Sequence, residues 1–326
     1  MKVVLVVILA VVVGLFVAIE IGLRSLFGFG NPLIYISDAE IGYLLAPNQR
    51  TRRFGNRIEI NQYSMRGAPI QKIPTPSTLR VLLLGDSIAN GGWWTDQANT
   101  ISSLMMHSLT SIIDPSYQEV EVLNVSANSW GPRNELAYLE KFSNFNAQAV
   151  VLLINTDDLF ATAPTSLPVG RDRNYPDTKP ALALVEILRR YILKQKPIAE
   201  MKAVNDEAGD RVGFNLEAIG KIQVLTRQSN SKFLLIMTPL LREIGELGSR
   251  DYENQARQRL RDFTQAQQIT YIDLLPIFNS TINPQSLYHD HIHLNLQGNQ
   301  LVSKVIERSL LEMLADVSQN NSVVNN

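Results

Sequence analysis

Two short stretches near opposite ends of this chain carry side chains suited to nucleophilic catalysis. Ser87 follows an apolar run over residues 80–85, and Asp290 stands shortly before His293 in a later turn-like stretch. An imidazole activates a serine hydroxyl by taking its proton, and a carboxylate at this offset can bind Nδ1 so that Nε2 faces the hydroxyl. These residue types predict attack of Ser87 on an acyl carbonyl, with His293 as the base and Asp290 as its orienting partner.

The strand predicted before Ser87 and the helix predicted after His293 would bring these side chains together. The aliphatic run 80–85 is typical of a buried strand. Ser87 would then lie at the strand's carboxyl end, which is where ligands bind in open α/β sheets, although Gly-Asp-Ser alone is also an ordinary turn sequence. His293 comes just before the last helical pattern, residues 296–315, for which Asn295 is a suitable N-cap.

Alternation of apolar runs with helical patterns predicts the fold. Further strands are expected over residues 120–125, 149–154, 233–237 and 269–274, and helices over residues 100–113, 132–142, 181–193, 216–227 and 252–267. Strands separated by helices favour one parallel sheet. We therefore expect an α/β fold, a doubly wound, flavodoxin-like five-stranded parallel sheet with helices on both faces.

The two catalytic stretches resemble the SGNH, or GDSL, family of serine hydrolases. That family places its nucleophile in Gly-Asp-Ser after the first strand and an Asp-x-x-His pair just before the final helix, as Ser87, Asp290 and His293 are placed here. Residues 61–67 also resemble a lead-in segment of its exported and membrane-attached members. The resemblance implies a Ser-His-Asp esterase that needs no cofactor and no metal, with the Ser87 backbone N–H in the oxyanion hole.

The family's second and third blocks are altered in this chain. Ser129 occupies the position of a glycine whose N–H completes the oxyanion hole, with Gly131 as the alternative if the register slips. Asp157 replaces an asparagine whose amide donates to the oxyanion, and an ionised carboxylate has no proton to donate. Either burial keeps Asp157 protonated, or Asn155 or Asn128 supplies the amide, or catalysis is weak or absent.

Three tryptophans fall near the expected catalytic edge. Trp93 and Trp94 follow Ser87 after Gly91-Gly92, and Trp130 follows Ser129. Indole faces suit sugar rings, although packing is an equally ordinary role. We therefore expect Trp93, Trp94 and Trp130 to bind substrate. Together with these residues, the resemblance implies an acyl ester substrate, above all an acetyl ester of envelope carbohydrate.

The amino terminus predicts a membrane anchor. Residues 3–19 are uncharged and almost wholly aliphatic, close to the length needed to span a bilayer, and no small-residue cleavage pattern follows. We favour an uncleaved single-pass anchor over a removed signal or a buried helix of a soluble protein, with the catalytic domain outside the cytoplasm, either periplasmic or extracellular. The expected segments are 1–30 anchor and interface, 31–78 irregular lead-in, 79–315 hydrolase domain and 316–326 disordered tail.

Composition narrows the alternatives. A net charge of −1 gives no reason to expect a nucleic-acid partner, and the absence of cysteine excludes disulfides and thiolate chemistry. Alternation of His289, His291 and His293 beside Asp290 leaves a metal site as the rival interpretation of that stretch. Two other functions remain open: O-acyl transfer by the same triad, and non-catalytic binding of an envelope polymer or partner protein.

Overall fold

The computed structural model describes residues 1–245 and 248–324. Its main sheet has five parallel strands in the order β6-β5-β7-β8-β9, which confirms the predicted doubly wound fold. The strands are β5 (Thr78–Gly85), β6 (Glu119–Ser126), β7 (Ala149–Asn155), β8 (Lys232–Thr238) and β9 (Thr270–Asp273). Because β5 lies between β6 and β7, the chain reverses its direction across the sheet beside β5, and the carboxyl end of β5 is the expected ligand-binding crevice.

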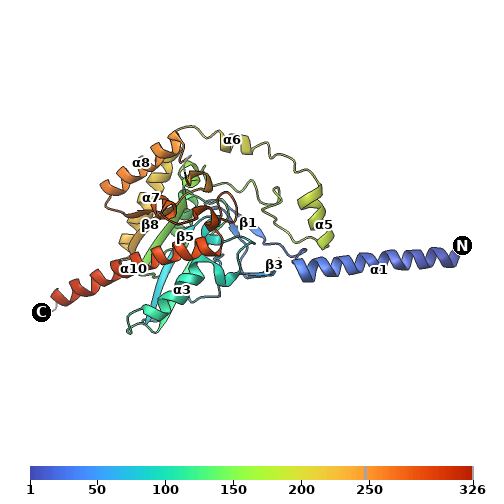
Figure 1. Cartoon of the computed structure of the whole chain (residues 1–326), viewed down its shortest axis with the longest axis horizontal. Helices are drawn as coiled ribbons and strands as arrows, with labels where there is room; N and C mark the ends of the chain where they lie inside the picture. Colours follow the sequence, from blue (N-terminus) through green and yellow to red (C-terminus); the bar gives the residue numbers. More distant parts are fainter. Residues whose placement is uncertain (246–247, 325–326) are drawn as a thin grey trace.

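Helices cover both faces of the sheet (Figure 1). One apolar cluster joins the sheet to α4 (Pro132–Phe142), α7 (Arg211–Gln228) and α8 (Asp251–Ala266). The second cluster joins the other face to α3 (Ile101–Ile112), α9 (Leu275–Asn279) and α10 (Leu296–Val324). Shorter helices are α2 (Ser87–Asn90), α5 (Ala183–Ile187), α6 (Met201–Asn205) and the turns η1 (Gln97–Asn99), η2 (Thr156–Phe160), η3 (Leu188–Ile192), η4 (Leu241–Glu243) and η5 (Pro284–Leu287).

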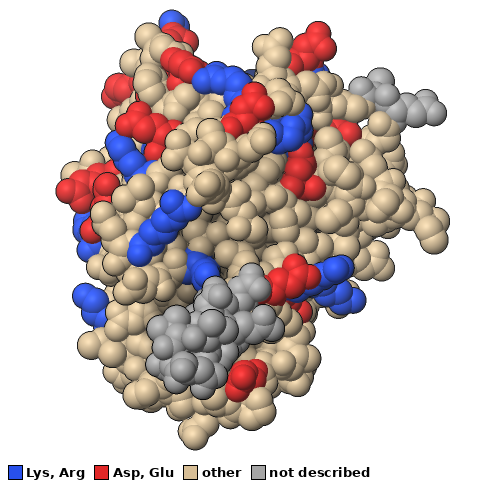
Figure 2. Space-filling view, turned by 90° about the vertical axis from the view of Figure 1, so that its left-hand side faces the viewer, with Lys and Arg blue, Asp and Glu red and all other residues tan. Residues whose placement is uncertain are grey.

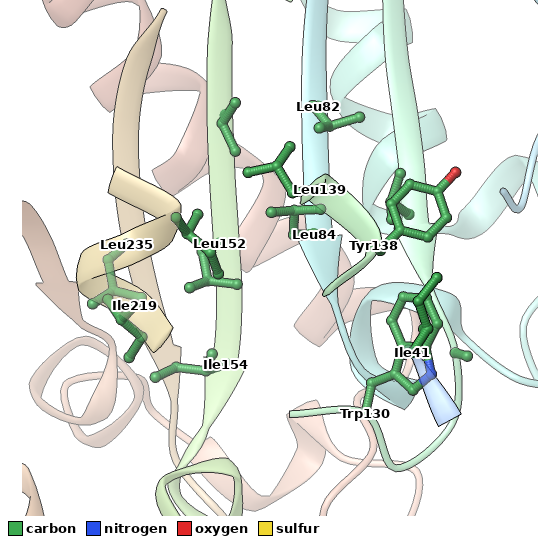
Figure 3. Close-up of a cluster of buried hydrophobic side chains, with 14 of the residues drawn as sticks. Ile41, Leu82, Leu84, Trp130, Tyr138, Leu139, Leu152, Ile154, Ile219 and Leu235 are labelled. Carbon is green, nitrogen blue, oxygen red and sulfur yellow. The ribbon is translucent and has the colours of Figure 1, made fainter. Parts of the chain in front are cut away.

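Alternation of side chains along the strands builds the two clusters. Leu82 and Leu84 of β5 enter the first cluster, whereas Val81 and Leu83 enter the second. Figure 3 shows the first cluster, in which Leu139 from α4 and other helical side chains meet those of neighbouring strands. Burial on both faces explains why the strands are continuous apolar runs. It also holds the carboxyl end of β5 firmly in place.

The lead-in segment forms two antiparallel hairpins. These are β1 (Tyr35–Asp38) with β2 (Gly42–Leu45), and β3 (Gln49–Arg53) with β4 (Asn56–Ile60). Ile41, Tyr43 and Ile58 are buried in the same cluster as the sheet and its helices. The hairpins are therefore packed into the domain core, next to the helices that cover one face of the sheet.

The first helix, α1 (Lys2–Phe27), projects away from the rest of the molecule, and none of its residues is buried (Figure 1). It has 26 residues, with a mean hydropathy of 3.2 over its most apolar part. That is long and apolar enough to cross a membrane, a property that signal sequences share.

Three helices differ from the sequence-based expectation. The helix expected over residues 216–227 begins earlier, as α7 (Arg211–Gln228). The segment 181–193 is a short α-helix, α5, followed by the wider turn η3. The last helix passes residue 315, where we expected it to end, and continues to Val324. No glycine or proline occurs between residue 299 and that point to stop it, so part of the segment expected to be disordered is helical. Residues 325 and 326 of the expected tail lie outside the described residues.

Candidate active site

Ser87, His293 and Asp290 form a continuous hydrogen-bonded row. The His293 Nε2 lies 2.9 Å from the Ser87 Oγ, and the His293 Nδ1 lies 2.7 Å from a carboxylate oxygen of Asp290. With a proton on Nδ1, the imidazole donates to Asp290 and accepts from the serine hydroxyl. The structure thus brings together the three residues that the sequence places in this chemistry.

A tight turn holds the Asp290 carboxylate. One of its oxygens accepts the backbone N–H groups of Ile292 and His293, at 2.9 and 2.8 Å. Although burial works in the opposite direction, the bonds from the His293 side chain and from these backbone groups lower the pKa of Asp290 to about 2. Asn295 accepts the N–H groups of Gln297 and Gly298, so it caps α10 as predicted. Asp290 is therefore anionic at neutral pH, on a turn that a capped helix supports.

The strand-to-helix turn that carries Ser87 is tightly packed. A Cβ on Gly85 would lie 2.8 Å from the Ala89 Cβ and 2.8 Å from the Leu153 carbonyl oxygen, so only glycine fits at the end of β5. Asp86 caps α2 by accepting the Ile88 N–H at 2.7 Å. Ser87 is the first residue of that helix, where a backbone N–H has no partner within the helix and is available to a developing oxyanion.

Three buried carboxyl groups lie behind the serine. Asp86, Glu135 and Asp158 are at most 6% exposed, and Asn155 donates to both Asp86 and Asp158 at 2.9 Å. Burial raises the pKa of Asp86, and it raises the pKa of Glu135 and Asp158 well above the usual range. Neither oxygen of the Glu135 carboxyl has a hydrogen-bond partner among the described residues. Protonation of this cluster is therefore favoured by its surroundings.

Asp157 is placed on the rim of the site. Its side chain is 58% exposed, and its carboxylate lies 3.6 Å from the guanidinium of Arg242. Burial of one side raises the pKa of Asp157, and Arg242 opposes that shift. Asp157 lines a cavity that also contains Ser87, but the described residues include no hydrogen bond between the two side chains.

The alternative amide donors have different surroundings. The Asn155 amide is engaged with Asp86 and Asp158, so it serves the structure behind the serine. Asn128 lines a cavity together with Ser87 and His293. Its side-chain oxygen is buried without a partner in the part of the chain that the structure describes. Both residues therefore line a cavity that includes Ser87, and only the Asn155 amide is engaged with carboxyl groups behind the serine.

Ser129 has a left-handed backbone conformation, which glycine adopts without strain. Its φ is +59°, in the left-handed region that a side chain disfavours by about 1–2 kcal/mol. The Tyr175 hydroxyl donates to the Ser129 Oγ at 2.9 Å, which holds the serine in this conformation. Gly131, the alternative position, precedes α4 with an extended φ of −139°. The left-handed turn therefore supports the register that assigns Ser129.

Ser87 lies where two cavities meet. The first, of about 300 Å³, is also lined by His293, Trp94 and Tyr191. The second, of about 490 Å³, is lined by Asp157, Phe160 and other residues of the segment that follows β7. A carbonyl held at Ser87 would therefore have room on both sides.

The three tryptophans have different positions. Trp93 is 41% exposed, and Trp94 packs against His293 with the ring centroids 4.2 Å apart. Both line the first cavity. Trp130 is 2% exposed and donates its indole N–H to the Tyr43 carbonyl at 3.1 Å, so most of its surface is packed in the core.

The side chains of the three alternating histidines have different neighbours. His293 meets Ser87, His289 stacks on Trp94 with the rings 6° from parallel, and the His291 side chain is 87% exposed. In residues 1–245 and 248–324, no group of three or more His, Asp or Glu side chains is arranged to hold a metal ion.

Sequence reasoning missed the role of one buried arginine. Arg66 is 1% exposed, and its guanidinium donates to the backbone carbonyls of Asn90, Gly92 and Thr95. These carbonyls belong to the loop that carries Trp93 and Trp94. The only signal for this position was the lead-in resemblance around residues 61–67, which did not indicate what the guanidinium binds.

Comparisons with known proteins identify the family of this chain. Solved structures with a similar fold include the acetylxylan esterase from Geobacillus stearothermophilus (15% identity, 73% of this chain and 95% of that chain covered, TM-score 0.47) and a lipase/acylhydrolase from Enterococcus faecalis (15%, 71% and 95%, TM-score 0.44). No curated protein matches the sequence. The model of the GDSL-like lipase/acylhydrolase family matches residues 83–301, from the end of β5 through the start of α10. The chain belongs to this GDSL-like lipase/acylhydrolase family, also called SGNH.

Proposed function

We propose that the protein is a serine acyl ester hydrolase in which Ser87 is the nucleophile, His293 the general base and Asp290 the residue that orients the imidazole. The hydrogen-bonded row from Asp290 through His293 to the Ser87 hydroxyl carries this proposal. Family membership supports the reaction class.

The reaction follows from this geometry. The Ser87 Oγ attacks the ester carbonyl carbon while His293 Nε2 takes the hydroxyl proton, and the ionised Asp290 stabilises the imidazolium. The negative oxygen is held by the backbone N–H groups of Ser87 and Ser129, whereas an ionised Asp157 donates nothing. The proton then passes to the leaving alcohol oxygen as its bond to the acyl carbon breaks. Water repeats the sequence on the acyl-enzyme and releases a carboxylic acid.

We also propose a setting and a substrate class. The helix α1 anchors the protein in a membrane, with the remaining domain outside the cytoplasm, and its length and hydropathy support this. The substrate is an acyl ester such as an acetyl ester of envelope carbohydrate. The exposed ring of Trp93 at the first cavity supports a sugar there, and the packed Trp130 gives less support.

A fluorophosphonate probe tests the nucleophile. We expect covalent labelling of the full chain, loss of labelling in Ser87→Ala, and normal labelling in Ser111→Ala, whose serine is exposed on α3. Absence of labelling in the native protein at every pH would sink the enzyme proposal and favour the non-catalytic binding module.

Acyl transfer to a second alcohol is the second candidate, because two cavities meet at Ser87. A transferase needs room for a donor on one side of the serine and an acceptor on the other. Product analysis with added sugar acceptors distinguishes the two: a transferase forms the new ester faster than it releases free acid.

A further inference from the structure

A short basic and apolar segment lies at the foot of α1. We define the foot segment as residues 188–196, which comprise η3 and the residues that follow it. Glu20 of α1 accepts the N–H groups of Ala183 and Leu184, at the start of α5, at 2.7 and 3.1 Å. The helix α5 therefore begins beside the last two turns of α1, and it runs across the direction of α1 at the end of the domain from which α1 projects (Figure 1).

This position is the level of a membrane interface. About 20 residues of helix span the hydrocarbon core, so a span that begins near the start of α1 ends near Glu20 and Arg24. The Arg24 side chain donates to the Ala181 carbonyl at 2.7 Å, and Phe29 contacts Tyr191 with ring centroids 6.2 Å apart. The foot segment thus lies just beyond the apolar span.

The composition of the foot segment fits that interface. Four large apolar or aromatic side chains are exposed: Leu188 by 38%, Tyr191 by 59%, Ile192 by 66% and Leu193 by 57%. The same nine residues contain four cations, Arg189, Arg190, Lys194 and Lys196. Apolar side chains with interspersed Lys and Arg are characteristic of segments that lie in the headgroup region of anionic bilayers. On the face at the far end of the molecule, by contrast, Lys and Arg lie beside Asp and Glu (Figure 2).

A basic hollow accompanies the segment. A cavity of about 390 Å³ is lined by six basic and three acidic side chains, and the foot segment contributes Arg189, Arg190, Lys194 and Lys196 to it. The excess of positive charge is complementary to a phosphate or another anionic headgroup.

The foot segment is fastened to the rest of the domain. Glu186, directly before it, forms a buried ion pair with Arg53 of β3 and accepts the Gly30 N–H at 2.6 Å. Arg173 donates to the carbonyls of Arg190 and Leu193 and to the Gln195 side chain. These bonds hold the backbone that carries the exposed apolar side chains. Less conformational entropy is therefore lost when the segment binds to a surface.

The first cavity of the candidate active site opens beside this segment. Tyr191 and Arg190 line it together with Ser87 and His293. A row of aromatic rings also links α1 to the imidazole: Phe27 contacts Phe54, Phe54 contacts Trp93, Trp93 contacts Trp94, and Trp94 contacts His293, with successive centroids 6.0, 5.4, 5.7 and 4.2 Å apart. A molecule at the membrane surface therefore reaches Ser87 along an apolar wall.

We propose that the foot segment docks on anionic headgroups of the membrane that holds α1, and that the Ser87 cavity takes its acyl ester from a lipid of that membrane. This inference rests on the proposed serine hydrolase and on α1 as an anchor. It narrows the proposed acyl ester to one carried by a membrane lipid, which includes a lipid-linked envelope carbohydrate and excludes a soluble polysaccharide.

Docking is tested independently of catalysis. The chain contains no cysteine, so Ile192→Cys and Ile282→Cys each give one labelling site, and Ile282 is fully exposed outside the foot segment. The full chain, labelled with a small fluorophore, is placed in nanodiscs that contain phosphatidylglycerol and nitroxide-bearing lipid. We expect quenching at position 192 to exceed that at position 282 by about twofold or more. Equal quenching at the two positions overturns the docking proposal. Equal quenching at position 192 with and without phosphatidylglycerol overturns the choice of an anionic surface.

The source of the ester is tested with a matched pair of double variants. Leu188→Ser with Ile192→Ser is compared with Val224→Ser with Ile282→Ser, which removes two exposed apolar side chains elsewhere. Loss of docking area in the first variant is expected to lower hydrolysis of a lipid ester in the nanodisc about fivefold or more, and to leave hydrolysis of soluble p-nitrophenyl acetate within about twofold. The second variant should change neither rate. Equal loss in both variants, or no loss in the first, overturns the inference. Absence of fluorophosphonate labelling instead marks failure of the proposed hydrolase and leaves the quenching result standing.

Discussion

Trp94 packs directly on His293, with the ring centroids 4.2 Å apart and the ring planes tilted by 49°. The imidazole that faces Ser87 is therefore held on two sides: Asp290 binds its Nδ1 edge, and the indole covers its face. A Cβ on Gly92, whose φ is +48°, would lie 2.4 Å from the Trp94 ring, so the glycine is required for the indole to occupy this place.

This packing predicts matching defects in two variants. Trp94→Ala removes the cover from His293, and Gly92→Ala pushes the indole away from it. Since a misplaced catalytic group commonly lowers the rate about 10²-fold, both variants should lose about 10-fold to 100-fold in kcat. Trp94→Phe keeps an aromatic face and should stay within about fivefold. Steady-state kinetics with melting curves check this, and a kcat unaffected in Trp94→Ala would show that the indole does not support the base.

Asp290→Asn should leave the fold intact and nearly abolish turnover. The asparagine amide would no longer favour the tautomer of His293 that carries its proton on Nδ1. A comparable change in a serine protease lowers kcat about 10⁴-fold. We expect a loss of about 10³-fold or more in kcat, with fluorophosphonate labelling slowed in parallel. Native-like activity in this variant would remove Asp290 from the mechanism.

The same carboxylate has a predictable pH dependence. Because its pKa is lowered to about 2, Asp290 stays ionised throughout the pH range in which esterases are assayed. Its contribution to folding stability is fully present above its unfolded-state pKa, near 3.8, and is lost as the pH falls through the folded value. A pH–rate profile should therefore show no loss between pH 5 and 7 that comes from protonation of Asp290.

Asp157→Asn should raise activity, and the gain should depend on pH. The amide adds an oxyanion donor where the carboxylate adds repulsion, and one such donor is worth about 10²-fold to 10³-fold in other enzymes. Since Asp157 is on the rim and paired with Arg242, we expect a smaller gain of about 10-fold at pH 8. Burial raises the pKa of Asp157, so more of the native protein is protonated at low pH, and the ratio of variant to native activity should shrink toward pH 5. A ratio near one at all pH values would show that position 157 does not face the oxyanion.

Glu135→Gln should stabilise the protein at alkaline pH. Burial raises the pKa of the Glu135 carboxyl, so the folded state keeps a proton that the unfolded state releases above about pH 4.5. Over that window the native protein loses about 1.4 kcal/mol of unfolding free energy per pH unit for this proton, and glutamine removes the loss. Urea unfolding at several pH values checks the prediction, with the exposed Glu140→Gln on the same helix as the control. Parallel pH dependence in the native protein and Glu135→Gln would contradict it.

The parts of the fold that sequence patterns predicted are those in which one physical rule dominates. Strands buried on both faces are continuous apolar runs, so all five were found, and the capping role of Asn295 follows from its place before α10. The proximity of Ser87, His293 and Asp290 could be predicted because the chemistry proposed for them needs particular residue types in a particular order. Contacts between distant segments have no such pattern. Arg66 reaching three carbonyls, Asp157 turning to Arg242 and Trp130 donating to Tyr43 depend on packing that only the folded chain defines.

The two hydrogen bonds between Glu20 and the start of α5 affect how the domain can move relative to α1. A domain joined to an anchoring helix by a slack tether could swivel and sample targets over a wide radius. If α1 is the anchor we propose, the two N–H groups that donate to Glu20 restrict that motion. In a bilayer the domain would keep a constant height and tilt. Lateral diffusion of whole molecules, and not reach, would then determine which targets meet the serine.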